Sequence, residues 1–144
     1  MTDPVAGARS LYHATIVDHD RNPRHEGALP AATHSATADN PLCGDVVTIR
    51  FVVDAGKITD AAFEARGCAL SRAAASMLTT RAIGATAADI AALATTFTNF
   101  VQTDAPATDL GELAAFEGVR AFKSRRVCAC LAFDAAVTAL AQGR

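Results

Sequence analysis

The four cysteines, Cys43, Cys68, Cys128 and Cys130, are the residues of this chain with the clearest capacity for chemistry. Thiolates bind soft metal ions, and the thiolate is the form of cysteine that attacks sulfur. An even number of cysteines suggests disulfides in a secreted chain, whereas spread cysteines in an intracellular chain are more typical of metal binding or reactivity. A cysteine can also be a small buried hydrophobe, so the positions of the four must decide between these roles.

Cys43 and Cys68 bracket a predicted β-hairpin. Residues 46–54 are rich in β-branched and aromatic residues, and a short Gly-containing connection joins them to residues 58–66, whose larger apolar residues are Ile58 and Phe63. A hairpin returns the chain to the end it left, so we expect the two sulfurs to be near neighbours. Asp45 follows Cys43 by two residues and therefore lies on the same side of an extended chain.

Two cysteines are expected at helix starts. Cys68 precedes the Ala-rich segment 69–82, and Cys128 is expected to open a helix within residues 125–142. A helix N-terminus favours a thiolate through its dipole and its free N–H groups. Cys130 lies two residues after Cys128 and faces another direction on a helix, so we expect it to be buried packing.

Together these arguments select one candidate site, made of Cys43, Asp45, Cys68 and Cys128. Three sulfur ligands and one carboxylate oxygen suit a tetrahedral Zn²⁺ ion, and they also suit an iron–sulfur cluster. The residues alone leave both open, because three thiolates and a carboxylate accommodate zinc or iron.

The elements that must position this site follow the order helix, strands, helices. Beyond the hairpin and its flanking helices we expect a helix over 6–19, an edge strand over 34–39, a helix over 86–101 and, over 102–117, a loop with at most one helical turn. This order predicts an α+β fold, a small antiparallel three-stranded sheet with helices packed on one face. The length of 144 residues predicts a single domain over 1–144.

Composition excludes several classes of function. The net charge of −2 gives no basic excess for nucleic acid and no polybasic segment for a lipid surface. The longest apolar runs are far shorter than the ~18 residues of a membrane helix. The chain does not open with a charged segment followed by an apolar stretch, so the cytoplasm is the expected location.

At these same residues the sequence resembles the IscU/NifU-type iron–sulfur cluster assembly proteins. The resemblance rests on residues 40–45 (NPLCGD), 67–71 (GCALS) with 75–77 (ASM), and 125–133 (RRVCACLAF), and it covers nearly the whole chain in order. Residues 100–122 resemble the insertion that the SufU branch carries before its third cysteine. Val127 stands where the scaffold branch has a histidine.

The resemblance implies an IscU/SufE-like fold and zinc bound by Cys43, Asp45, Cys68 and Cys128. It also implies that Cys43 accepts persulfide sulfur from a SufS-type cysteine desulfurase, as a zinc-dependent sulfurtransferase, and supplies downstream iron–sulfur assembly proteins. Two alternatives stay open: a scaffold that builds a [2Fe–2S] cluster on the same ligands, and a structural zinc-binding interaction domain.

Overall fold

A computed structural model describes residues 13–103 and 105–142 of the chain. In chain order the elements are α2 (Ala14–Arg21), β1 (His34–Asn40), β2 (Asp45–Asp54), β3 (Lys57–Arg66), α3 (Ala69–Ala82), α4 (Ala87–Gln102), the 3-10 helix η1 (Gly111–Ala121) and α5 (Lys123–Leu140). The first expected helix, over 6–19, lies partly outside the described residues. Within them, α2 continues two residues beyond the expected end.

The three strands form one antiparallel sheet in the order β1-β2-β3, as predicted. The connection between β2 and β3 is the pair Ala55 and Gly56, whose φ angles of 50° and 80° are typical of a tight hairpin turn. Alternate residues of β2 are fully buried, namely Val47, Ile49 and Phe51. This alternation turns one face of the sheet towards the helices.

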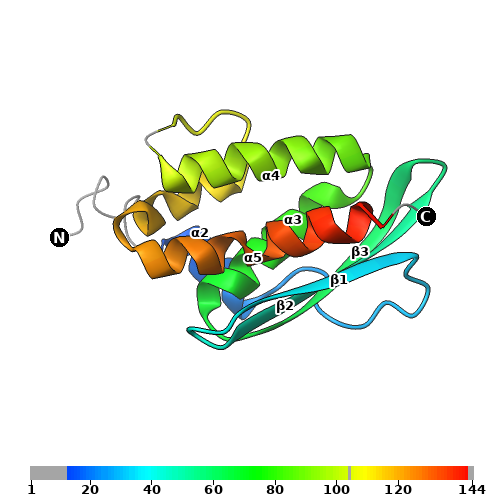
Figure 1. Cartoon of the computed structure of the whole chain (residues 1–144), viewed down its shortest axis with the longest axis horizontal. Coiled ribbons are helices and arrows are strands. Elements are labelled where there is room, and N and C mark those ends of the chain that lie inside the picture. Colours follow the sequence, from blue (N-terminus) through cyan, green and yellow to red (C-terminus); the bar gives the residue numbers. More distant parts are fainter. Residues whose placement is uncertain (1–12, 104, 143–144) are drawn as a thin grey trace.

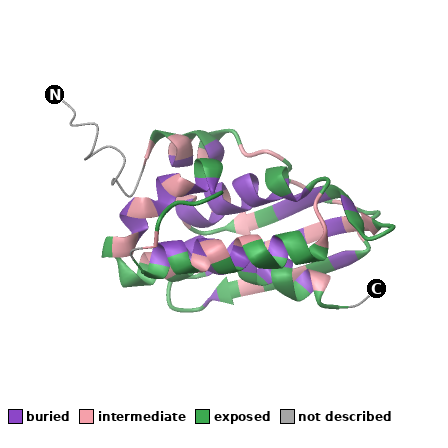
Figure 2. Cartoon of the chain, turned by 90° about the horizontal axis from the view of Figure 1, so that it is seen from above, coloured by how far each residue is buried: buried purple, intermediate pink, exposed green. Residues whose placement is uncertain are grey.

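The helices cover that one face in two layers (Figure 1). Helices α3 and α5 pack directly on the sheet, α3 mainly against β3 and α5 against β1 and β2, while α4 packs on α5. Buried and exposed residues alternate along the helices (Figure 2). The α+β expectation is therefore confirmed.

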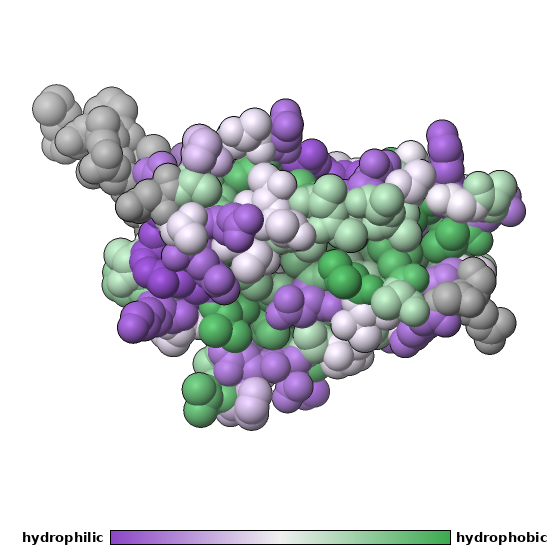
Figure 3. Space-filling model, turned by 45° about the horizontal axis from the view of Figure 1, so that its top comes forward, coloured by the Kyte–Doolittle hydropathy of each residue, from purple (hydrophilic) through white to green (hydrophobic). Residues whose placement is uncertain are grey.

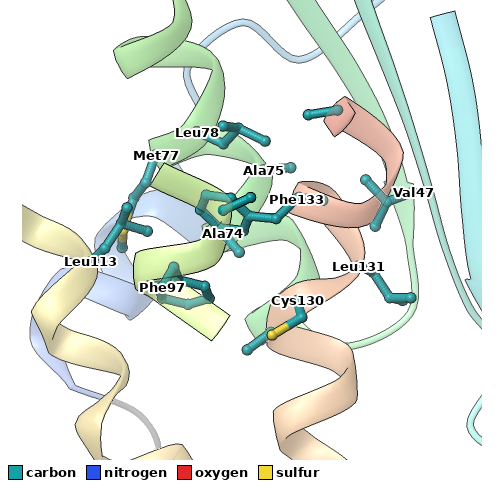
Figure 4. Packing of buried hydrophobic residues seen from close by; sticks show 14 of the residues in the cluster. Val47, Ala74, Ala75, Met77, Leu78, Phe97, Leu113, Cys130, Leu131 and Phe133 are labelled. Atoms are coloured by element: carbon teal, nitrogen blue, oxygen red, sulfur yellow. The ribbon is translucent and has the colours of Figure 1, made fainter. Parts of the chain in front are cut away.

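Phenylalanine fills the interior between the Ala-rich helices. The Phe97 and Phe133 rings stack with their centroids 4.5 Å apart, and Phe116 meets Phe97 edge-on at 5.4 Å. Small alanine side chains such as Ala74 and Ala75 let the helix backbones approach around these rings (Figure 4). On the outside, the view of Figure 3 shows a broad apolar area bordered by polar side chains.

The expectation of a loop with at most one helical turn over residues 102–117 is partly wrong, because the 3-10 helix η1 occupies residues 111–121. Leu110, Leu113, Phe116 and Val119 recur every third residue and are all fully buried. A 3-10 helix has 3.0 residues per turn, so this spacing keeps all four side chains on one inward face. The period was visible in the sequence, but it matches neither the α-helical nor the strand period.

A buried histidine connects η1 to helices α2 and α3 through its side-chain contacts. His19 of α2 is 1% exposed, and its Nδ1 lies 2.7 Å from Ser76 Oγ of α3. Its Nε2 lies 3.0 Å from a carboxylate oxygen of Glu112 at the start of η1. The Ser76 hydroxyl also accepts the Arg24 backbone N–H at 2.9 Å, so α2, α3 and η1 meet at this point.

The last helix begins earlier than predicted. Phe122 is the extended residue that separates η1 from α5, with φ −131° and ψ 97°, and the helix starts at Lys123. Cys128 therefore lies in the second turn of α5, and the expectation that it opens the helix is wrong. Among the described residues, no helix has the length and apolar character needed to cross a membrane.

Candidate metal centre

The turn between β1 and β2 presents Cys43. The side-chain oxygen of Asn40 accepts the Leu42 N–H at 3.2 Å, and the backbone oxygen of Asn40 accepts the Gly44 N–H at 2.8 Å. Gly44 has a φ of +76°, a conformation that glycine adopts at no steric cost. The turn therefore holds Cys43 exposed at one end of the sheet.

The Cys43 sulfur lies beside a buried sulfur of α5. Its distance to Cys128 Sγ is 3.3 Å, and Cys128 is 1% exposed. Donor atoms of Cys43, Asp45 and Cys128 all lie within 4.8 Å of one another. The packing of α5 on β1 and β2 thus brings together residues that are 85 positions apart.

Asp45 ties the start of β2 to the start of α3. This side chain is 2% exposed, and its Oδ1 accepts the Cys68 backbone N–H at 3.0 Å. Its Oδ2 lies 3.1 Å from Cys68 Sγ and accepts the Ser71 hydroxyl at 2.7 Å. Because Cys68 is the N-cap residue of α3, the carboxylate sits where a helix favours negative charge.

The structure therefore brings the four predicted residues together, but not as the hairpin argument expected. Cys43 pairs with Cys128, and the Cys68 sulfur lies outside the tightest group and meets it through Asp45. Three thiols and a carboxylate from three separate segments fit a divalent cation that prefers sulfur and oxygen donors.

Glycine makes the approach of Asp45 to α3 possible. Gly67 has a φ of +120°, and a Cβ atom placed on it would lie 2.0 Å from Asp45 Oδ1 and 2.8 Å from Asp45 Cα. Any side chain at Gly67 would therefore displace the carboxylate. Sequence reasoning used Gly67 only as part of a motif and missed this contact, which follows from the fold.

The ionisable groups at the centre influence one another. For Asp45, burial raises the pKa of the carboxyl, but hydrogen bonds from Cys128, Ser71 and Cys68 outweigh burial and leave the pKa below its usual value. Burial raises the pKa of the Cys128 thiol far above its ordinary value, and its hydrogen bonds to Asp45 and Cys43 add to this. The thiolate expected at Cys128 from a helix N-terminus is thus not favoured by the protein alone. A bound cation would reverse this balance, since coordinated thiols lose their protons.

Cys130 belongs to the core and not to this centre. It is 6% exposed and packs among apolar side chains (Figure 4). The Thr98 hydroxyl lies 4.0 Å from its sulfur. Burial raises the pKa of its thiol to about 11. The structure therefore agrees with the prediction that Cys130 is packing.

Apolar side chains stand exposed next to the two paired cysteines. Leu42 precedes Cys43 and is 96% exposed, while Val127 precedes Cys128 and is 48% exposed. Large exposed apolar residues that gather at one place are typical of a contact surface.

Comparisons with known proteins identify the family and agree with this fold. The model of the NifU-like N terminal domain matches residues 11–129. The iron–sulfur cluster assembly scaffold protein IscU of Streptococcus pyogenes serotype M1 is 39% identical over 127 residues, which cover 87% of this chain and 79% of that protein. The zinc-dependent sulfurtransferase SufU of Bacillus subtilis is 34% identical over 134 residues, covering 90% of this chain and 89% of that protein.

The fold is shared as well. The crystal structure of a SufU protein from Fervidobacterium islandicum AW-1 superposes with a TM-score of 0.84 at 27% identity, covering 90% of this chain and 96% of that one. The three-stranded sheet and the order of the helices are thus those of a known architecture. The chain belongs to the NifU-like N-terminal domain family, the family of the IscU and SufU proteins.

Proposed function

We propose that this chain works in iron–sulfur cluster assembly, where it accepts persulfide sulfur at Cys43 from a SufS-type cysteine desulfurase and passes it to downstream assembly proteins. The observation that carries the proposal is the contrast between the two paired sulfurs. Cys43 is exposed on a turn, whereas Cys128, 3.3 Å away, is buried. The Cys43 thiol is therefore accessible to a partner protein, and the Cys128 thiol is not. A cytoplasmic location remains a prediction.

In this proposal zinc is held by Cys43, Asp45, Cys68 and Cys128. When bound, zinc keeps the thiols deprotonated at neutral pH and so offsets the effect of burial on Cys128. Asp45 is the weakest of the four ligands, because zinc prefers thiolate to carboxylate. The hydrogen bond from the Cys68 backbone N–H keeps the Asp45 carboxylate beside the centre both with and without zinc.

The proposed transfer is a thiol exchange. The Cys43 thiolate attacks the outer sulfur of the donor persulfide, a new sulfur–sulfur bond forms on Cys43, and the bond within the donor breaks. The desulfurase cysteine leaves as a thiolate, and the transferred sulfur keeps its proton. The exposed Leu42 next to Cys43 supports contact with a partner at this point.

A second candidate is a scaffold that assembles a [2Fe–2S] cluster on the same ligands. The relative from Streptococcus pyogenes is named a scaffold, which supports this candidate. A structural zinc module is less well supported, because such a site is closed, and Cys43 is exposed.

Metal analysis and desulfurase turnover test the proposal together. We expect the chain purified without oxygen to carry one zinc, which Cys68→Ala and Cys128→Ala lose. The wild-type chain should accelerate a SufS-type desulfurase, and Asp45→Ala should accelerate it less. Full zinc in both cysteine variants would contradict the site, and iron with acid-labile sulfide in place of zinc would favour the scaffold.

A further inference from the structure

We propose that Ser71 is the positioning residue of the metal centre, which holds the Asp45 carboxylate in the orientation in which it would bind the ion. This inference rests on the proposed metal site. Ser71 lies on α3, three residues after the N-cap residue Cys68, and it is fully buried.

The Ser71 hydroxyl contacts the inner side of the centre. Its Oγ lies 2.7 Å from Asp45 Oδ2, 3.2 Å from the Cys128 backbone oxygen and 3.8 Å from Cys68 Sγ. Ser71 therefore links Asp45 of β2, Cys68 of α3 and Cys128 of α5. Such a contact to a carboxylate ligand fixes the direction of the ligand and tunes its affinity.

The two carboxylate oxygens have different partners. Oδ1 is held by the Cys68 backbone N–H, which cannot rotate away. Oδ2 accepts the Ser71 hydroxyl at 2.7 Å and lies 3.1 Å from Cys68 Sγ. The carboxylate is thus held at one oxygen by the backbone and at the other by the Ser71 hydroxyl, so the Ser71 contact fixes its direction.

Ser71 differs from the other side-chain neighbours of Asp45. Its Oγ lies 2.7 Å from Asp45 Oδ2, whereas the nearby Cys68 Sγ lies 3.1 Å from the same oxygen. Cys68 is itself one of the proposed ligands, but Ser71 is not, so its hydroxyl stays available to hold the carboxylate.

The chain offers a matched control on the same helix. Ser76 is also fully buried in α3, but its hydroxyl faces His19 and the Arg24 backbone N–H and does not contact the centre. Ser71→Ala and Ser76→Ala therefore remove the same atom at equal burial. Only the first change removes a donor to Asp45.

The experiment measures the Zn²⁺ dissociation constant by competition with a chromogenic chelator, with circular dichroism to confirm folding. Loss of a partner to a metal ligand weakens affinity by about 10- to 100-fold, so we expect this loss in Ser71→Ala and wild-type affinity in Ser76→Ala. In an Asp45→Ala background, Ser71→Ala should cause no further loss, because its effect passes through Asp45. If Ser71→Ala does not fold, Ser71→Thr and Ser71→Val provide the comparison, since they share a shape and differ in the hydroxyl. The Ser71→Thr variant should bind zinc more tightly than the Ser71→Val variant.

Wild-type zinc affinity in Ser71→Ala, or equal affinity of the Thr and Val variants, would overturn this inference alone. An equal loss in the Asp45→Ala background would also overturn it, because Ser71 would then act independently of the carboxylate. Failure of the wild-type chain to bind zinc would instead overturn the metal centre itself, and the inference with it.

Discussion

Replacing Gly67 by alanine should separate backbone strain from damage to the metal centre. The new Cβ atom would lie 2.0 Å from Asp45 Oδ1 and 2.8 Å from Asp45 Cα, so both the side chain and the backbone of Asp45 must move. Gly84 provides the control, because its φ is +91° and a Cβ atom there meets nothing within 4 Å. Gly84→Ala therefore places a side chain at a positive φ without a steric clash with neighbouring atoms.

The magnitude follows from the contacts that are lost. A residue with a side chain in such a backbone conformation costs about 1–3 kcal/mol, a cost that both variants share. Gly67→Ala should also break the hydrogen bond from Cys68 N–H to the Asp45 carboxylate, and a hydrogen bond to a charged group contributes about 1.5–3 kcal/mol. The free energy of unfolding of Gly67→Ala should therefore lie below that of Gly84→Ala by about 1.5–3 kcal/mol.

Urea unfolding of the zinc-free chains measures this difference, and chelator competition measures zinc affinity in the same preparations. We expect Gly67→Ala to bind zinc much more weakly, since one ligand is displaced, and Gly84→Ala to bind as the wild type does. Equal unfolding free energies together with equal zinc affinities would refute the reasoning, because Asp45 would then tolerate a side chain at Gly67.

Three further predictions concern reactivity, partner contact and pH. In the zinc-free chain, iodoacetamide should modify the exposed Cys43 before the buried Cys128, as peptide mapping over time would show; equal rates would contradict the assigned exposures. Leu42→Glu should leave the melting temperature unchanged because Leu42 is 96% exposed, but it should lower the acceleration of the desulfurase. Ile83→Glu changes another exposed apolar residue, at the end of α3 away from Cys68, and should not lower this acceleration. The pKa of Asp45 is lowered from 3.8 on folding, so its contribution to stability is present above that value and is lost as pH falls through the folded pKa. Urea unfolding of the zinc-free chain from about pH 7 to 3 should therefore show a smaller loss in Asp45→Asn than in the wild type; parallel curves would contradict this.

Local patterns predicted the elements that depend on local residues. The β-branched and aromatic residues of 46–54 predicted a strand, and β2 occupies this segment with alternate residues buried. The bounds of α3 were predicted to the residue, because its Ala-rich segment lacks Gly and Pro and follows Cys68 at the N-cap. Hairpin geometry and turn chemistry act over short stretches of chain and selected Cys43, Asp45 and Cys68, whereas Cys128 was selected from a helix start that lies five residues earlier in the structure.

Features that depend on packing could not be predicted in this way. The 3-10 helix η1 forms because residues spaced by three meet a core built by distant segments. The pairing of Cys43 with Cys128 depends on how α5 lies across β1. The roles of Ser71 and Gly67 follow only from the position of Asp45, which the spacing of the cysteines does not reveal.

Intact-mass and peptide mass spectrometry after incubation with a SufS-type desulfurase and cysteine tests the central claim most directly. The account predicts that the wild-type chain gains the mass of one sulfur atom, located on the peptide that contains Cys43. Cys43→Ser should gain none and should remain folded, because this residue lies exposed in a turn. A wild-type chain that gains no sulfur, or a Cys43→Ser variant that gains as much as the wild type, would contradict the account.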